Sequence, residues 1–244
     1  MAARLSVNVN KVATLRNARG GDVPSVIAAV RTIVAAGAPG ITIHPRADER
    51  HIRAVDARAI ATELAPLREQ IEFNIEGDPR PDLLAMVEEL RPHQCTLVPV
   101  RPGEITSQAG WPTDTSRTEL GAITSRLHGL GVRVSLFIEA DLEAVRWARD
   151  VGAQRIELYT EPFARGFAAG RGEAELARFA AAAELAHDLG LGINAGHDLD
   201  LDNLPLFSRL PHLDEVSIGH ALISHALFVG LDRAVRDYLA VLVE

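Results

Sequence analysis

The sequence predicts an α/β fold of the (β/α)8 type, a TIM barrel. Eight short β-rich runs alternate with longer helical patterns along the chain. Several helical patterns end in a glycine that is followed directly by the next β-rich run, as in AAGAPG, HGLGV and HDLGLG. The length of 244 residues agrees with the roughly 250 residues typical of this barrel. We therefore expect a single barrel domain over residues 1–244.

The expected strands are short runs rich in β-branched and aromatic residues. In chain order they are LSVNV (5–9), GITI (40–43), IEFNI (71–75), CTLVP (95–99), RVSLFI (133–138), RIELYT (155–160), LGINA (191–195) and EVSIG (215–219). Because strands that alternate with helical patterns are typical of βαβ units, these runs are expected to pair in one parallel sheet.

Apolar residues recur at helical spacing in the segments between the strands. In the segment 22–36, Asp22 is a candidate N-cap, Pro24 suits the first turn, and Val26 and Val30 begin the apolar stripe. The other expected helices are 56–68, 82–90, 116–129, 141–152, 172–190, 202–208 and 224–243.

An open, doubly wound sheet is the alternative fold. Such a sheet usually carries a glycine-rich dinucleotide-binding turn after its first strand. In this chain VNVNKVATLRNARGG occupies that place, and no GxGxxG motif occurs. The complete set of eight strand patterns favours the closed barrel.

Composition and charge restrict the class of function. The net charge of −8 disfavours binding to nucleic acid. Cys95 is the only cysteine, so no intrachain disulfide can form, and a reducing, cytoplasmic location is expected. The N-terminus lacks the apolar core of a signal peptide, and no stretch approaches the roughly 20 apolar residues of a membrane span. We therefore expect no membrane partner.

Polar side chains gather where the expected strands end, which is the active-site end of a (β/α)8 barrel. They are Asn8, Asn10, Lys11, His44, Arg46, Arg50, His51, Glu76, Glu139, Asp141, Glu157, Tyr159, Asn194, His197 and His220. A single histidine at a strand end is more often structural than catalytic. As an alternative to a catalytic role, Glu76 or Glu157 would form half of a structural ion pair with Arg46 or Lys11. The convergence of so many groups at one rim favours an enzyme.

Two glycine-containing turns predict an anion site. In GHALISHALF a helix is expected to begin just after Gly219 and His220, with its first N–H groups available to an anion. The turn NAGHDL (194–199) follows the seventh strand, and phosphate sites of these barrels often lie after strands seven and eight. Arg16 and Arg19 follow the first strand, where they either bind phosphate or belong to a solvated loop.

No metal site is expected. His44 and Arg46 are spaced to share one side of a strand, but no cysteine cluster, HExxH motif or acidic triad accompanies them. The long segment 101–116 contains two glycines, two prolines and three threonines. It is interpreted as a lid that excludes water, with a surface excursion or a subunit contact as alternatives.

Eight segments in register resemble the pyridoxine 5′-phosphate synthase family. They are VNVNKVATLRNARG, ITIHPRADERHIR, FNIE, LVPVRPGEIT, VSLFIEAD, IELYT, INAGHDL and SIGHALI. The resemblance implies a (β/α)8 barrel with extra helices that assembles as a homo-octamer. It implies a transferase of vitamin B6 biosynthesis that uses no metal or organic cofactor. Such an enzyme condenses 3-amino-2-oxopropyl phosphate with 1-deoxy-D-xylulose 5-phosphate to pyridoxine 5′-phosphate, phosphate and water.

The same resemblance implies roles for individual residues. His44 and Glu76 would accept protons, His197 would donate one, and Glu157 would stabilise a transition state. The residues that would hold the aminoketone phosphate are Asn8, Arg19, His197, Asp198, Gly219 and His220. The residues that would hold the deoxyxylulose phosphate are Asn10, Lys11, Arg46, His51 and Thr106.

Two sites depart from many relatives of that family. Asn10-Lys11 stands where Asp-His is common, and lysine lacks the tunable acid–base character of histidine. Asp198 stands where glycine is common. Because a carboxylate aimed at a phosphate would repel it, we expect the Asp198 side chain to point away from the ligand.

Two other functions stay open. The chain is alternatively another phosphate-binding barrel enzyme, of the epimerase or aldolase type. An aldolase would require a Schiff-base lysine at a strand end, and Lys11 is the only lysine. A non-catalytic phosphometabolite-binding protein would bind both phosphates and release nothing.

Overall fold

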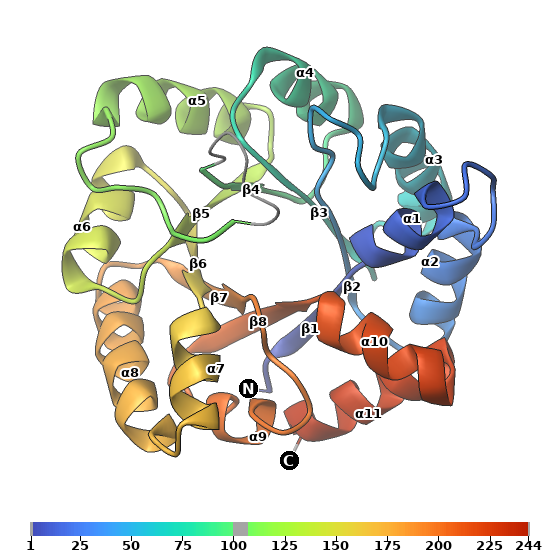
Figure 1. Ribbon diagram of the computed structural model, residues 1–244. Coiled ribbons are helices and arrows are strands. Elements are labelled where there is room, and N and C mark those ends of the chain that lie inside the picture. Colours follow the sequence, from blue (N-terminus) through green and yellow to red (C-terminus); the bar gives the residue numbers. More distant parts are fainter. Residues whose placement is uncertain (1, 100–106, 244) are drawn as a thin grey trace.

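The structure, a computed structural model, describes residues 2–99 and 107–243. Within these ranges eight parallel strands close into a barrel in chain order, with helices around the outside (Figure 1). The strands are β1 (Arg4–Asn8), β2 (Gly40–Ile43), β3 (Glu72–Gly77), β4 (Gln94–Leu97), β5 (Arg133–Ile138), β6 (Arg155–Tyr159), β7 (Gly192–Gly196) and β8 (Leu213–Ile218). The predicted (β/α)8 barrel is thereby confirmed, and each expected strand overlaps an observed one.

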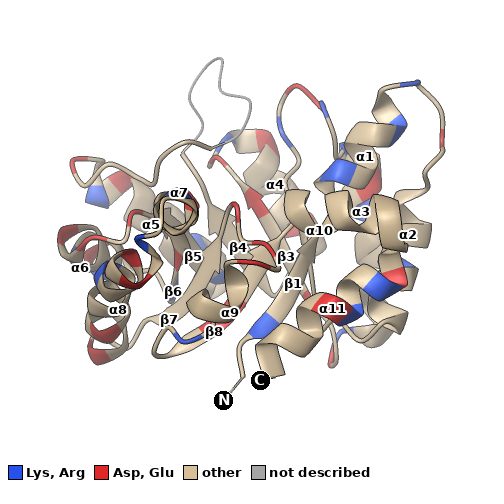
Figure 2. Ribbon diagram, turned by 60° about the horizontal axis from the view of Figure 1, so that its bottom comes forward, with Lys and Arg blue, Asp and Glu red and all other residues tan. Residues whose placement is uncertain are grey.

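The connections between strands contain more helices than the sequence predicted. The helices are α1 (Asn10–Asn17), α2 (Val26–Ala35), α3 (Ala54–Leu64), α4 (Pro81–Leu90), α5 (Arg117–Gly129), α6 (Leu142–Val151), α7 (Glu161–Ala168), α8 (Gly172–Asp188), α9 (Leu204–Phe207), α10 (His220–Val229) and α11 (Leu231–Val243), with a 3-10 turn at Ala65–Leu67. Helices α1 and α7 were not expected from periodicity, and they add to the eight helical segments that the sequence predicted. In Figure 2 the helix α1 lies at the end of the barrel opposite to the two chain termini.

Two predicted helix boundaries were wrong. The N-cap of α2 is Ser25, whose Oγ accepts a hydrogen bond from Ala28 N at 3.2 Å, so the helix begins after Asp22 and Pro24. The expected last helix is divided into α10 and α11 by Gly230, whose φ of 87° interrupts the helical backbone.

The strands alternate between apolar side chains that pack against the helices and polar side chains that fill the barrel. Leu5 and Val7 of β1 are fully buried in the main core. The intervening Ser6 bonds Thr42 Oγ1 at 2.7 Å, and Asn74 Nδ2 donates to the same oxygen at 3.3 Å. These polar side chains satisfy one another across neighbouring strands. The barrel interior is therefore polar, whereas such interiors are commonly filled by branched apolar residues.

Buried charges occupy the end of the barrel where the strands begin. Glu72 pairs with Arg4 at 3.1 Å and with Arg133. Glu215 is 1% exposed and accepts a hydrogen bond from Asn194 Nδ2 at 3.3 Å. Burial, reinforced by the charge of Glu72, raises the pKa of Glu215 to about 8. This end of the barrel is consequently closed by a network of buried ion pairs and hydrogen bonds.

An aromatic cluster fixes the helices that follow β6 and β7. The ring centroid of Phe207 in α9 lies 4.9 Å from that of Phe163 in α7 and 5.5 Å from that of Phe179 in α8. All three side chains are fully buried. This packing holds the segments after β6 and β7 against one another. None of the described helices has both the length and the apolar character that a membrane span requires.

Candidate active site

A cavity of about 430 Å³ lies at the ends of the strands that the sequence predicted as the functional end. Of the predicted site residues, those that line it are Asn8, Asn10, Lys11, His44, Arg46, His51, Glu76, Glu157, His197, Asp198, Gly219 and His220. Arg19 is described but lies outside this lining, on the exposed turn after α1. Thr106 falls outside the described residues.

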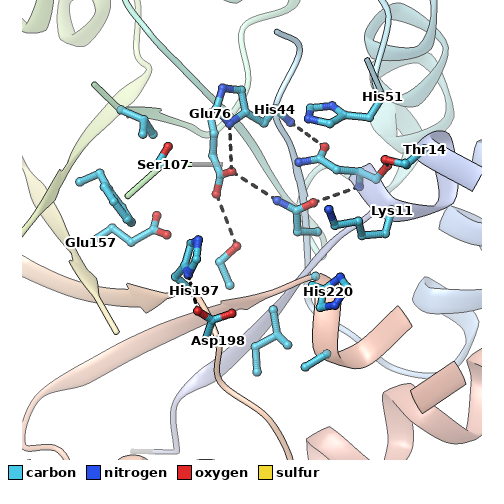
Figure 3. A pocket seen from close by; sticks show the side chains of 18 of the residues that line it. Lys11, Thr14, His44, His51, Glu76, Ser107, Glu157, His197, Asp198 and His220 are labelled. Atoms are coloured by element: carbon cyan, nitrogen blue, oxygen red, sulfur yellow. Dashed lines mark hydrogen bonds and ion pairs between the residues drawn. The ribbon is translucent and has the colours of Figure 1, made fainter. Parts of the chain in front are cut away.

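Glu76 near the end of β3 occupies the centre of the cavity (Figure 3). Asn8 Nδ2 donates to its Oε2 at 3.3 Å, and Ser217 Oγ approaches its Oε1 at 3.5 Å. The side chain is buried, and burial together with the charge of Glu157 raises its pKa well above the usual range. Within the described residues the basic side chain closest to it is His44, whose Nδ1 lies 4.0 Å from Oε2, so the expected alternative of a structural pair with Arg46 or Lys11 is not realised.

His44 follows β2, and its ring stands beside Glu76. Its backbone N–H donates to Asn10 Oδ1 at 2.9 Å, so the side chain of Asn10 fixes this end of β2. Burial lowers the pKa of His44 to about 3, with smaller contributions from the charges of His51 and Arg46. Its Nε2 atom is buried and has no hydrogen-bond partner among residues 2–99 and 107–243. His44 is therefore a neutral imidazole at the cavity wall.

Glu157 of β6 faces the cavity from the side opposite to His44. Its Oε2 atom is buried without a hydrogen-bond partner in the described part of the chain. Burial raises its pKa to about 7, opposed by a hydrogen bond from Thr96 and by the charge of His197. A Cβ atom at Gly196 would lie 2.5 Å from Glu157 Oε1. The glycine at the end of β7 thus makes room for the carboxylate.

The turn after β7 carries two consecutive non-glycine residues in the left-handed region. The φ angle is 93° at His197 and 60° at Asp198. Such a conformation costs on the order of 1–3 kcal/mol per residue and persists only when neighbours hold it. Thr160 Oγ1 donates to the carbonyl oxygen of His197, and Asn203 Nδ2 donates to that of Asp198 at 3.0 Å. Asp198 does not extend into the cavity centre, because its carboxylate bonds the ring of His197.

One side of the cavity is cationic. Lys11 at the start of α1 and Arg46, Arg50 and His51 after β2 all line it. His51 Nδ1 accepts a hydrogen bond from Ile52 N at 3.0 Å, which leaves Nε2 as the proton-bearing nitrogen of the neutral ring. Burial, followed by the charges of Arg46 and Lys11, lowers the pKa of His51 to about 4. These groups form a site suited to an anion.

Arg16 has a structural role, contrary to the possibility that it binds phosphate. It is buried, and its guanidinium forms a bidentate pair with Asp56 of α3, with N···O distances of 2.6 and 2.8 Å. The arginine therefore attaches α1 to α3 and holds Lys11 over the cavity.

Beside Lys11, the cavity is bounded by the start of α10, since β8 pairs with β1. Gly219 is the N-cap residue, and the first N–H groups of the helix have no carbonyl partner within it. A Cβ atom at Gly219 would lie 3.0 Å from the Cβ of Asn8, so glycine lets β8 close against β1. With His220 beside it, this helix start is suited to a second anion.

Several lining residues were missed by the sequence analysis. Ser217, Phe137 and Ser107 belong to the cavity wall, and Arg50 was noted only as a strand-end residue. Ser217 was predictable, because it lies two positions after the inward-facing Glu215 on the same strand. Phe137 packs with Tyr159 at 5.4 Å between ring centroids, and Val98 joins them in a small apolar wall. No group of three or more His, Cys, Asp or Glu in residues 2–99 and 107–243 is arranged to hold a metal ion.

The fold and the cavity together define a (β/α)8-barrel enzyme of the general acid–base type, with its titratable groups where the strands end. The model of the family described as "Pyridoxal phosphate biosynthesis protein PdxJ" matches residues 5–244. The chain belongs to this family.

Curated relatives share about half of the sequence. "Pyridoxine 5′-phosphate synthase" of Bacteroides thetaiotaomicron is 51% identical over 236 residues, which cover 96% of this chain and 97% of the relative. The protein of the same name from Christiangramia forsetii is 50% identical over 240 residues, covering 98% and 99%.

Solved structures resemble the chain in fold alone. The 3-keto-L-gulonate-6-phosphate decarboxylase of Vibrio cholerae superposes with a TM-score of 0.64 at 12% identity, covering 99% of this chain and 98% of the other. Tryptophan synthase of M. tuberculosis gives a TM-score of 0.64 at 12% identity, with 99% and 93% covered. Both likenesses agree with the barrel and carry no argument about the reaction.

Proposed function

We propose that the chain is a pyridoxine 5′-phosphate synthase, which condenses 3-amino-2-oxopropyl phosphate with 1-deoxy-D-xylulose 5-phosphate. The observation that carries the proposal is the meeting of His44, Glu76 and His197, at the ends of three different strands, around one cavity. The reaction requires an amine to add to a ketone, water and phosphate to leave, and a ring to close. Each of these steps moves protons, so several acid–base groups around one intermediate are its main requirement.

Glu76 is the principal proton acceptor in this proposal. A carboxylate whose pKa is raised by burial is a stronger base, once it has lost its proton, than an exposed one. His44 is a neutral acceptor, because its lowered pKa keeps the ring uncharged. A neutral imidazole can take a proton transiently and pass it on without leaving a buried charge.

His197 is the proton donor, and Glu157 stabilises positive charge that develops on the intermediate. The two groups lie at the ends of the neighbouring strands β6 and β7, and the charge of His197 lowers the pKa of Glu157 against the effect of burial. A carboxylate in a buried site interacts strongly with a neighbouring cation. Glu157 is consequently suited to an iminium-like carbon–nitrogen centre.

The two phosphates bind at two separate groups of residues on the cavity rim. Lys11, Arg46 and His51 hold the deoxyxylulose phosphate, with Asn10 and Arg50 adjacent. The start of α10 at Gly219–His220 holds the aminoketone phosphate together with Asn8. Arg19 and Thr106 belong to this proposal by resemblance only.

We propose further that the chain forms a cytoplasmic homo-octamer in which residues 1–244 act as one domain. Exposed apolar side chains support an assembly, since Leu227 and Phe228 at the end of α10 are 69% and 89% exposed. Sedimentation of the purified protein tests this, and a monomer at micromolar concentration would contradict it.

The decisive experiment mixes the purified protein with both phosphorylated substrates. Phosphate release and pyridoxine 5′-phosphate formation are expected in equal amounts, and neither is expected when one substrate is omitted. Product without phosphate, or phosphate without product, would contradict the proposal. Borohydride trapping of a ketose phosphate on Lys11, which lines the cavity, would instead favour the aldolase alternative. Binding of both phosphates without turnover would favour the non-catalytic alternative.

A further inference from the structure

The side chain of Asp198 is bound to the ring of His197. Its Oδ2 lies 2.9 Å from His197 Nδ1, a normal length for a charge-assisted hydrogen bond. In Figure 3 the imidazole stands between Asp198 on one side and the carboxylates of Glu76 and Glu157 on the other. The carboxylate therefore contacts one edge of the ring, while the other edge faces the centre of the cavity.

The carboxylate is not what holds the turn. The backbone carbonyl of Asp198 is held by Asn203 Nδ2, and that of His197 by Thr160 Oγ1. Glycine would adopt the φ of 60° at position 198 more readily than aspartate does. Thr160 and Asn203 therefore hold the turn without the Asp198 carboxylate. The contact that the carboxylate makes is with the ring of His197.

We propose that Asp198 is a positioning residue for His197, which orients the imidazole and stabilises its protonated form. This inference rests on the proposed role of His197 as proton donor. A carboxylate at Nδ1 accepts the Nδ1 proton and so directs Nε2 into the cavity as the nitrogen that exchanges a proton with substrate. It also balances the charge of the imidazolium before the proton is given up.

Other titratable groups, both acidic and basic, also surround the ring of His197. Glu157 and Tyr159 face it from β6, Glu76 from β3 and His220 from α10. Tyr159 packs edge-on against the ring at 5.1 Å between centroids, and burial raises the pKa of this tyrosine to about 12, so it stays neutral. The hydrogen bond from His197 holds the pKa of Asp198 below its usual range, and the charge of His220 acts in the same direction. Asp198 is therefore an ionised group in direct contact with the ring.

The test compares Asp198→Asn and Asp198→Gly with the native protein. The ring of His197 is observed by ¹⁵N NMR without substrate, and kcat is measured against pH. In native protein the neutral ring is expected to carry its proton on Nδ1. Asp198→Gly is expected to populate the Nε2–H tautomer, whereas the amide oxygen of Asp198→Asn can still accept from Nδ1. In both variants the basic limb of the profile of kcat against pH is expected to shift to lower pH.

The magnitude separates positioning from substrate binding. We expect kcat to fall roughly ten- to hundredfold in Asp198→Gly, with KM changed less. The same range is typical when the hydrogen-bond partner that orients a metal-binding histidine is removed. Asp202→Asn, which removes the same charge from the same loop away from the ring, is the matched control and should leave the tautomer and the pH profile unchanged. An unaltered tautomer together with an unaltered profile in Asp198→Gly would overturn the inference. Because the NMR measurement needs no turnover, it tests the pairing even if the proposed reaction is wrong.

Discussion

The Oε2 atom of Glu76 lies 4.0 Å from Nδ1 of His44, and the pKa values of the two groups are shifted in opposite directions from those of an ion pair. Burial raises the pKa of the carboxyl group and lowers that of the imidazole to about 3. Each shift favours the uncharged form. The pair is therefore a neutral acid beside a neutral base, and substrate that enters the cavity meets two groups able to exchange protons without an existing strong ion pair.

Replacing Glu76 by glutamine should abolish most turnover while the barrel stays folded. Glutamine keeps the shape and the oxygen that accepts from Asn8 Nδ2, but it cannot take a proton. We expect kcat to fall roughly 10²- to 10⁴-fold, the usual contribution of a general base. The thermal midpoint should be unchanged or higher, because a neutral amide needs no buried proton or charge. A fully active Glu76→Gln protein would show that the base is another residue.

His44 should remain uncharged throughout the pH range in which the enzyme works. Its pKa of about 3 is set mainly by burial, with further lowering by His51 and Arg46. Side-chain NMR shifts of His44 should therefore stay constant between about pH 5 and 8, whereas an exposed histidine titrates near 6.5 in that range. Titration of His44 near its ordinary value would contradict its burial as described. It would also remove the argument that the ring acts as a neutral acceptor.

The outline of the fold and of the site was accessible from sequence because both depend on periodicity. Strand runs such as GITI are buried on both faces, and the side chains that follow them, such as His44, necessarily reach the same rim of a parallel barrel. Helix α1 was not accessible, because only Val12, Ala13 and Arg16 of it are buried and no apolar stripe marks it. The pairing of Arg16 with Asp56 depends on tertiary packing of two helices. The contact between His197 and Asp198 depends on left-handed backbone angles, which neither residue type predicts.

Stability should fall as pH rises above neutrality, and Glu215 should be a cause. Its pKa is raised to about 8 in the folded chain against about 4.5 when unfolded, so the folded state binds more protons between these values. The stabilisation is complete below the unfolded value and is lost as pH rises through the folded one. His44 has the opposite sign, but its contribution ends at its unfolded value of 6.5. Between about pH 6.5 and 8, the change in the free energy of unfolding therefore reports on the carboxyl groups with raised pKa and not on His44.

Urea unfolding of native protein and of Glu215→Gln at both ends of this window measures the effect. Each pKa unit corresponds to about 1.4 kcal/mol, so Glu215 contributes roughly 2 kcal/mol at most to the fall in unfolding free energy. The glutamine variant should show a correspondingly smaller fall, since it retains an acceptor for Asn194 Nδ2 and has no proton to lose. Equal slopes in the two proteins would mean that Glu215 titrates normally. The charge of Glu215 also contributes to the raised pKa of Glu76, so the difference between the two proteins includes this indirect effect of residue 215.

Gly196→Ala should disable the site through Glu157 without unfolding the barrel. The added Cβ would lie 2.5 Å from Glu157 Oε1 and 3.2 Å from the backbone oxygen of Ser217. The first contact is the end of a flexible side chain, so the carboxylate is expected to move rather than the strand. Displacing a group from its productive position by about 1 Å can cost around 10²-fold in rate, and kcat should fall on that order. Gly129→Ala, where nothing lies within 4 Å of the added atom, is the control and should keep full activity. Normal kcat in Gly196→Ala, with Glu157 shifted in its crystal structure, would remove Glu157 from the reaction. Normal kcat with Glu157 in place would show that β7 yields instead.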